Sequence, residues 1–296
     1  MASNPIKPMR SMLFVPGNKA NMIEKAAGAR ADALILDLED SVPPDLKIEA
    51  RQIVVSRLGW LAERKQRIWV RINRSAHLYD FDDILAVVSP EVEGIVISKP
   101  CGPEDLHTVS SMLAEAEYRA GLPIGHTQVI PLLETARSLQ LAYEIALHDR
   151  VPAIVGATCK NADVARALKT VWSPEGRETL YLKSRIVMAA RAAGKLPIGG
   201  VWQQVHDLLG LEAAAANDRQ LGMSGELVLH PSNIDIINRT YCPPEEEVAF
   251  YQGMIEALDK AQAQGRASCL YEGEHIDIAH AKTAREVIEL ARSFNQ

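Results

Sequence analysis

The chain has 296 residues, a net charge of −6 and no block rich in lysine and arginine, so its composition is not that of a nucleic-acid-binding protein. It is 47% hydrophobic and 24% charged, as expected of a globular protein, and no apolar run approaches the length of a membrane span. The four cysteines form no C-x-x-C pair, which argues against a zinc site or a disulfide framework. Residues 1–10 have no apolar signal core, and we expect a cytoplasmic protein.

Short continuous runs of Val, Ile and Leu recur along the chain with helical segments between them. Such runs are typical of parallel strands that are buried on both faces. The seven clear runs are Met12–Val15, Ala33–Leu36, Ile68–Ile72, Gly94–Ile97, Gln128–Leu133, Ala153–Val155 and Leu227–Leu229. A weaker eighth lies at Leu196–Ile198. Eight strands would close a (β/α)8 barrel, whereas seven could form an open doubly wound sheet.

Two features favour the barrel. The segment after the first run, Pro16–Lys19, lacks the G-x-G-x-x-G pattern of a dinucleotide-binding sheet. Polar side chains follow nearly every run, and a barrel brings all of these strand ends to one catalytic rim. We therefore predict an α/β protein with a TIM barrel over residues 1–242.

The pattern changes after Pro243. Two prolines and three glutamates begin a helix that we expect to end near Ala263, and a final helix is expected from about Ile278 to Ser293. Because the barrel strands are complete by then, residues 243–296 are predicted to be a helical extension that packs on a neighbouring subunit.

Glu134 and Asp163 each follow a predicted strand. Carboxylates at the ends of consecutive parallel strands can converge on one hard cation and leave its other positions to water and substrate. Such a cation polarises a carbonyl oxygen. The alternative is that both are surface acids at helix starts, where carboxylates are favourable.

A series of motifs in fixed order resembles one family. The motifs are Arg10–Gly17, Leu36–Val42, Val70–Asn73, Pro131–Thr135 and Leu229–Pro231. Together they closely resemble the citrate lyase β-subunit and malyl-CoA lyase family, in the HpcH/HpaI aldolase group of phosphoenolpyruvate/pyruvate-type barrels. The resemblance covers nearly the whole chain, from about Met9 to Ala291.

The resemblance implies roles for individual residues. It gives Glu134 and Asp163 to a Mg²⁺ ion and Arg71 to the oxygens of the substrate. It places Asp37, Glu39 and Asp40 beside the metal and its water shell. It places Phe14, Lys19 and Lys25 against an acyl-CoA. A C-terminal motif of the family, matched loosely at His275–Ala279, brings Asp277 into a neighbour's active site.

The chain departs from the family pattern in three places. The segment 156–163 is about four residues longer than usual, and Asp163 is the aligned acid when the count runs back from Ser173. Gly199-Gly200-Val201-Trp202 lacks the usual aspartate before the glycine. His275 and Ala279 replace the methionine and proline of the C-terminal motif.

Several residues also have structural interpretations. Arg71 could pair with Asp37 or Glu39 inside the barrel, and Lys99 is interpreted as a structural ion-pair partner. Asp277 alone would be a helix N-cap. His230 is interpreted as a packing residue at a strand end, and Cys159 as an ordinary thiol.

The sequence and the resemblance together predict a Mg²⁺-dependent carbon–carbon lyase. It would split a citryl-, malyl- or citramalyl-type 3-hydroxyacyl-CoA into a 2-oxo acid and an acyl-CoA, or join them. The alternatives are a class II aldolase that acts on free 2-oxo acids, and a non-catalytic CoA-binding or accessory subunit. A homotrimer or hexamer is expected, with no nucleic acid or membrane as partner.

Overall fold

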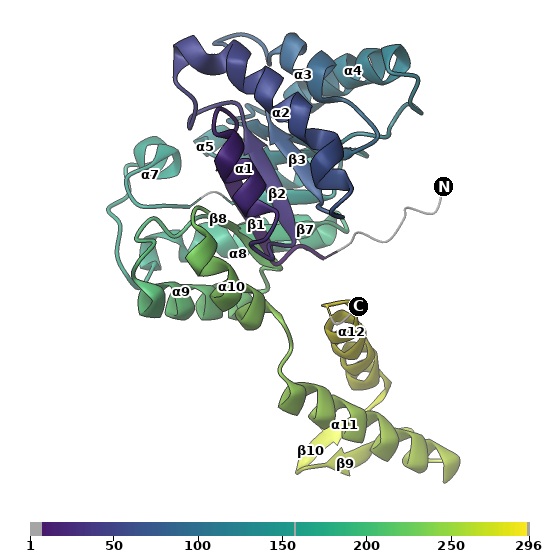
Figure 1. The fold of residues 1–296 in the computed structure, drawn as a ribbon. Coiled ribbons are helices and arrows are strands. Elements are labelled where there is room, and N and C mark those ends of the chain that lie inside the picture. The colour runs from purple at the N-terminus through teal and green to yellow at the C-terminus, as the bar shows by residue number, and fades with distance from the viewer. Residues whose placement is uncertain (1–7, 157, 295–296) are drawn as a thin grey trace. The chain divides into compact units, whose positions relative to one another are not determined.

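The computed structural model describes residues 8–156 and 158–294, and the chain divides into two compact units between Asn238 and Arg239. The first unit is a closed barrel of parallel strands in the order β1 to β8, which confirms the predicted TIM barrel (Figure 1). The strands are β1 Ser11–Pro16, β2 Ala33–Asp37, β3 Ile68–Arg71, β4 Val92–Ser98, β5 Gln128–Leu132, β6 Ala153–Val155, β7 Leu196–Gly199 and β8 Gly225–Val228. The weak eighth run is therefore a strand, and it pairs with both β6 and β8.

Helices follow the strands and form the outer layer of the barrel (Figure 1). The α-helices of this unit are α1 Ala20–Ala26, α2 Lys47–Ala62, α3 Phe81–Val87, α4 Pro103–Arg119, α5 Ala136–Gln140, α6 Ala142–Ala146, α7 Asp163–Leu168, α8 Leu180–Ala192, α9 Leu208–Leu221 and α10 Ile234–Tyr241. Three short 3-10 helices are η1 Pro44–Leu46, η2 Arg177–Thr179 and η3 Pro231–Asn233. Among the described residues, no helix is both long enough and apolar enough to cross a membrane.

The barrel interior is filled by apolar side chains from alternate strand positions. Trp69 on β3 is fully buried in this interior cluster and is the largest fully buried side chain. Its register partner on β4 is Gly94, where an added Cβ would lie 2.4 Å from the Trp69 ring. Gly94 therefore leaves the space that the indole fills, as the close packing of protein interiors requires.

The second unit contains α11 Glu245–Ala263, the hairpin strands β9 Cys269–Tyr271 and β10 Glu274–Ile276, and α12 Ile278–Phe294. Met254 and Leu258 of α11 pack with Ile276 and with Ala281 and Ala284 of α12 in a small core of their own. Both helices lie where the sequence predicts them. The division of labour between a catalytic barrel and an extension that packs on a neighbouring subunit stays a prediction.

Candidate functional site

Charged side chains continue the interior face of the barrel above its apolar layer. Successive side chains of a strand alternate between its two faces, so a residue two positions beyond an interior residue also points inward. The interior residues and the charged residues two positions later are Ile35 and Asp37, Trp69 and Arg71, and Leu132 and Glu134. The carboxyl-terminal rim therefore collects polar groups directly above the core, as predicted.

Arg71 and Asp37 form a buried bidentate pair at this rim. The guanidinium Nε and Nη2 of Arg71 each donate to Asp37 at 2.6 Å, and the backbone N–H groups of Glu39 and Ser41 also donate to this carboxylate. Burial alone would raise the pKa of Asp37, but the hydrogen bonds and charge of Arg71 hold it below its ordinary value. The ion pair with Asp37 considered for Arg71 from the sequence is thus present.

Arg71 keeps one further nitrogen for the rest of the site. Its Nη1 lies 3.2 Å from Glu39 Oε2, and its guanidinium carbon lies 4.7 Å from the centre of the Phe14 ring. Phe14 in turn packs against the interior core. The guanidinium is therefore fixed on both sides, with little freedom to follow a ligand.

Glu39 connects the strand-end acids of β2 to β4. Ser98 Oγ donates to Glu39 Oε1 at 2.5 Å, and Tyr79 fixes this strand end by donating to the Ser98 carbonyl at 2.9 Å. Asp40 is exposed beside Glu39, and its Oδ2 lies 3.8 Å from Arg71.

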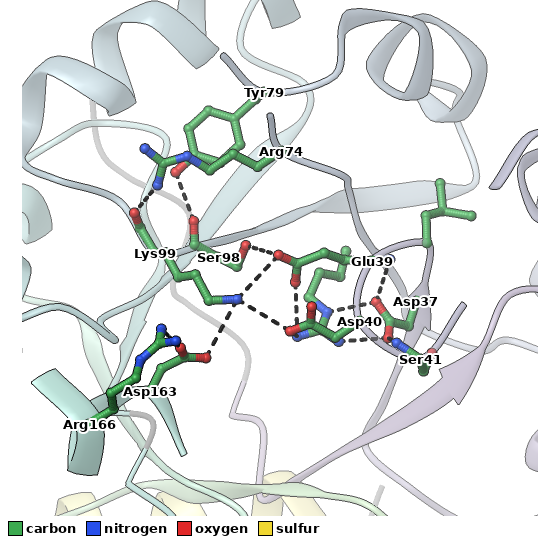
Figure 2. A network of polar contacts seen from close by, with 12 residues as sticks. Asp37, Glu39, Asp40, Ser41, Arg74, Tyr79, Ser98, Lys99, Asp163 and Arg166 are labelled. Atoms are coloured by element: carbon green, nitrogen blue, oxygen red, sulfur yellow. Dashed lines mark hydrogen bonds and ion pairs between the residues drawn. The ribbon is translucent and has the colours of Figure 1, made fainter. Parts of the chain in front are cut away.

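Lys99 stands at the centre of the charged rim (Figure 2). Its Nζ lies 3.5 Å from Glu39, 3.3 Å from Asp40 and 3.5 Å from Asp163, carboxylates that come from two parts of the chain, the segment after β2 and the start of α7. Burial lowers the pKa of Lys99, but the surrounding acids, which include Glu134, raise it above its ordinary value. Lys99 is therefore an ion-pair partner, as expected, and it pairs with several carboxylates rather than with one.

Asp163 has the helix-start position that one of its sequence interpretations predicts. It is the first residue of α7, where a carboxylate favours the helix terminus and pairs with Arg166. Its other oxygen faces Lys99 (Figure 2). A helix-start acid can thus also belong to the rim.

Glu134 is fixed at the rim by the local structure that follows it. Thr135 caps α5 by accepting from the N–H of Ser138 at 3.0 Å, so the chain turns into a helix directly after Glu134. Burial raises the pKa of Glu134 to about 7, although Lys99 and Arg71 oppose the shift. Its Oε2 is buried, with no hydrogen-bond partner among the described residues.

Of the predicted acyl-CoA residues, Phe14 belongs to this cluster through its contact with Arg71, and Lys19 and Lys25 lie at the two ends of α1. Lys19 is exposed directly before α1, and Lys25 is exposed in the last turn of that helix. Asp277 belongs to the second unit, where its Oδ1 accepts from the N–H of Ala279 at 2.9 Å and so caps α12. Within this chain, Asp277 therefore has the capping role that its position before a helix suggests.

Comparison with known proteins identifies the family of this barrel. The model of the HpcH/HpaI aldolase/citrate lyase family matches residues 10–231. The chain belongs to this family. It is 31% identical to the citrate lyase subunit beta of Leuconostoc mesenteroides, over 96% of this chain and 93% of that protein. It is 29% identical to a (3S)-malyl-CoA thioesterase of Cereibacter sphaeroides, over 97% of this chain and 96% of that protein.

Solved structures of similar proteins share the fold. A citrate lyase from Burkholderia xenovorans superposes with a TM-score of 0.83 at 20% identity, over 100% of this chain and 95% of that one. CitE from Mycobacterium tuberculosis, in complex with magnesium and acetoacetate, gives a TM-score of 0.65 at 25% identity, over 81% of this chain and 93% of that one. The barrel architecture is therefore that of the family.

The rim has the donors that Mg²⁺ prefers. Mg²⁺ is usually bound by one or two carboxylates, and water and substrate oxygens complete its octahedron. The described residues contain no cluster of three or more His, Cys, Asp or Glu side chains arranged as a complete metal cage. The partnerless buried oxygen of Glu134 and the nearby Asp163 carboxylate fit a two-carboxylate site, and Lys99 already neutralises part of this acidic group.

His230 and Cys159 have surroundings that agree with the structural interpretations given to them from the sequence. His230 Nδ1 accepts from the N–H of Ser232 and so caps η3, as a strand-end structural residue would. Burial, followed by the charges of Glu134 and Asp163, raises the pKa of Cys159 to about 11, which keeps it a thiol.

Proposed function

We propose that this protein is a Mg²⁺-dependent carbon–carbon lyase. Its substrate would be a 3-hydroxyacyl-CoA whose C3 carries the hydroxyl and a carboxylate, and its products would be a 2-oxo acid and an acyl-CoA. The observation that carries this proposal is the buried, partnerless Oε2 of Glu134 at a rim that also contains Asp163 and Arg71. The similarity to citrate lyase and malyl-CoA proteins supports the substrate class.

Each rim residue has a defined task in this proposal. Glu134 and Asp163 would hold Mg²⁺, which supplies electrophilic polarisation of the oxygens of the 2-oxo acid half. Arg71 would offset the negative charge that develops on the C3 oxygen as its proton is removed, before this oxygen becomes the carbonyl oxygen of the 2-oxo acid. Asp37 acts through Arg71 and is a positioning residue, because both of its oxygens are already engaged. Glu39 and Asp40 would hold the water shell beside the metal.

The reaction also needs proton transfers. A base removes the proton of the C3 hydroxyl. The electrons of the C2–C3 bond then pass to the thioester, which becomes an enolate, and an acid returns a proton to C2. We propose that Asp277 of a neighbouring subunit supplies this proton. Lys19 and Lys25 would stabilise the phosphates of CoA as exposed point charges, and Phe14 would contact the acyl-CoA.

The metal assignment predicts that Glu134→Gln and Asp163→Asn each weaken Mg²⁺ binding by at least about tenfold, because each removes a charged ligand. Isothermal calorimetry measures this directly. Asp82→Asn on the outer helix α3 is the matched control, since it removes one exposed negative charge away from the rim. Unchanged Mg²⁺ affinity in Asp163→Asn would mean that another residue of the rim is the second ligand.

The reaction is tested by incubating candidate hydroxyacyl-CoA thioesters with the protein and Mg²⁺, while 2-oxo acid and free thiol are measured together. A lyase releases 2-oxo acid without free thiol. A thioesterase, like the Cereibacter relative, would release thiol. Equal turnover of the free hydroxy acid would favour an aldolase, and no turnover with any thioester would favour a non-catalytic subunit.

A further inference from the structure

A cavity of about 530 Å³ lies beside the carboxyl ends of β6, β7 and β8. Its walls come from the segment that follows β6, the segment that follows β7, and the inner sides of α8 and α9. The rim acids described above, Asp37, Glu39, Asp40 and Glu134, are not among its lining residues. The cavity is therefore a separate compartment next to the charged cluster.

The lining of this compartment adjoins the reaction site on two sides. Val164, which lines the cavity and is buried, directly follows Asp163 in the chain. On the other side, Val201 and Leu227 line the cavity and also pack in the apolar cluster of the barrel interior. The cavity therefore borders both the segment that begins at Asp163 and the apolar interior of the barrel.

Unlike the rim, the cavity has two indole rings in its lining. Trp172 and Trp202 face the cavity with ring centres 6.3 Å apart and planes tilted by 56°. Trp202 Nε1 donates to the Asp207 carbonyl at 3.1 Å, so the polar atom of this indole is satisfied and its rings are left for apolar contact. Lys160 Nζ lies 4.8 Å from the Trp172 ring centre. The lining also includes the charged residues Lys183, Arg177, Glu175, Glu178, Asp218 and Glu226. Lys183 pairs with Asp218, and Glu178 accepts from Ser173, so part of this polar lining is satisfied within the protein. Aromatic walls of this kind favour hydrocarbon or aromatic groups over charged ones.

The cavity also collects this chain's own departures from its relatives. Cys159 and Lys160 belong to the longer segment after β6, and Trp202 ends the Gly-Gly-Val-Trp segment after β7. The two segments touch closely, because a Cβ at Gly200 would lie 2.1 Å from the Thr158 carbonyl oxygen. The two segments that depart from the family pattern, through the added residues after β6 and the missing aspartate at Gly199, therefore meet at one compartment.

We propose that this cavity binds the side chain of the 2-oxo acid half of the substrate, and that the protein prefers 2-oxo acids with a hydrocarbon or aromatic side chain larger than methyl. This inference rests on the proposed function, because it assumes that the 2-oxo acid binds at Glu134 and Asp163. It goes further by assigning the class of 2-oxo acid.

The test is calorimetric binding of pyruvate, 2-oxohexanoate and phenylpyruvate to the full-length protein in Mg²⁺. Burial of several additional carbon atoms predicts that the two larger acids bind at least about tenfold more tightly than pyruvate. Trp202→Ala should remove this preference and leave pyruvate affinity within about twofold, since pyruvate does not reach the indoles. Trp60→Ala is the matched control, because Trp60 lies on the outer helix α2 and contacts Arg64 there. It should retain the preference.

The outcomes separate the two proposals. Equal affinity for all three acids, or a preference that survives in Trp202→Ala, overturns the assignment of the cavity and leaves the proposed function standing. If none of the three acids binds in the presence of Mg²⁺, the proposed function fails, and the assignment fails with it. Retained pyruvate binding in Trp202→Ala also shows that this variant is folded.

Discussion

Lys99 is the residue on which the rim depends most. It has a left-handed backbone conformation with φ of 51°, which is costly for a residue with a side chain, and its carbonyl accepts a hydrogen bond from Arg74. This backbone places its ammonium among Glu39, Asp40 and Asp163. A strained backbone that delivers a charge to a site is a recurrent feature of functional sites.

We predict that Lys99→Met raises Mg²⁺ affinity severalfold, because the ammonium no longer competes with the cation for the rim carboxylates. Turnover should fall, since Asp163 and Glu39 lose a positioning partner. Calorimetry and steady-state kinetics measure the two effects. Lys65→Met makes the same charge change at an exposed left-handed position before β3 and should alter neither. A loss of Mg²⁺ affinity in Lys99→Met would mean that Lys99 favours Mg²⁺ binding by orienting Asp163 more than it opposes binding by competing with the cation.

Single residues were predicted from the sequence where their position limits their partners. Arg71 and Asp37 end neighbouring strands, so their contact follows from the barrel itself. The central position of Lys99 could not be predicted, because it depends on a left-handed residue and on the fold of α7, which brings Asp163 across the rim. The cavity was also not predicted, because its walls come from irregular segments without periodicity.

At the level of elements, a buried ion pair joins α4 to the strands at the other end of the barrel. Glu117 of α4 is fully buried, and its two oxygens accept from Arg150 at 2.7 and 2.8 Å. The N–H groups of Gly125 and Thr127 also donate to it. Burial would raise the pKa of Glu117, but Arg150 and these N–H groups lower it below its ordinary value. The pair fixes the chain just before β5 and β6 begin.

We predict that Glu117→Gln lowers the free energy of unfolding by about 3–5 kcal/mol near neutral pH, because Arg150 stays buried without its counter-charge. Since the pKa of Glu117 is lowered in the folded state, its stabilising effect is present above the ordinary pKa of a glutamate. It is lost as the pH falls through the folded-state pKa. Wild-type stability should therefore decline more steeply in acid than that of the variant. Urea unfolding across this pH range measures both effects.

Glu115→Gln is the control on the same helix. Its partner Arg119 lies four residues away, and both side chains are about half exposed. Such pairs contribute less than about 1 kcal/mol. If Glu117→Gln is no more destabilising than Glu115→Gln, the buried pair does not stabilise the barrel.

The strands were predictable because burial on both faces gives continuous apolar runs. Leu196–Gly199 was the weakest signal, since it contains a proline and a glycine and is followed by a second glycine, yet pairing with two neighbours makes it a strand. The hairpin of β9 and β10 was missed in part. No strand was predicted at Glu274–Ile276, which gives only a weak signal because it is three residues long and two of these residues are polar.

For the whole molecule, the open question is where Asp277 acts. It caps α12 within its own unit. The hydrogen bond with the His280 side chain contributes most to lowering the pKa of Asp277, and the N–H groups of Ala279 and His280 also lower it. We propose that the protein is a homotrimer or hexamer in which this residue also reaches a neighbour's barrel. A side chain can cap a helix and face a partner at once, because a cap uses one oxygen.

We predict that Glu134→Gln and Asp277→Asn are each inactive and that mixing them under subunit exchange restores activity. With equal amounts and random assembly, roughly a quarter of the sites would combine a wild-type Glu134 with a neighbour's wild-type Asp277. Activity after exchange, with exchange verified by mass spectrometry of tagged subunits, is the measurement. If exchange is complete and nothing returns, Asp277 does not act in trans. Full activity of the Asp277→Asn variant alone would mean that Asp277 serves only as the N-cap of α12.

The pairing of Trp69 with Gly94 limits how this barrel can diversify. A closed barrel has an interior of fixed size, so an indole on one strand and a bare backbone on the next share a single space. A side chain at position 94 would meet both the indole at 69 and the backbone carbonyl of Gln128, so position 94 cannot change while both neighbours stay as they are. Rim residues such as Asp40, which is exposed, have charge partners but no comparable steric limit. New specificities in this lineage should therefore arise by single steps at the rim, while its interior changes only in correlated pairs.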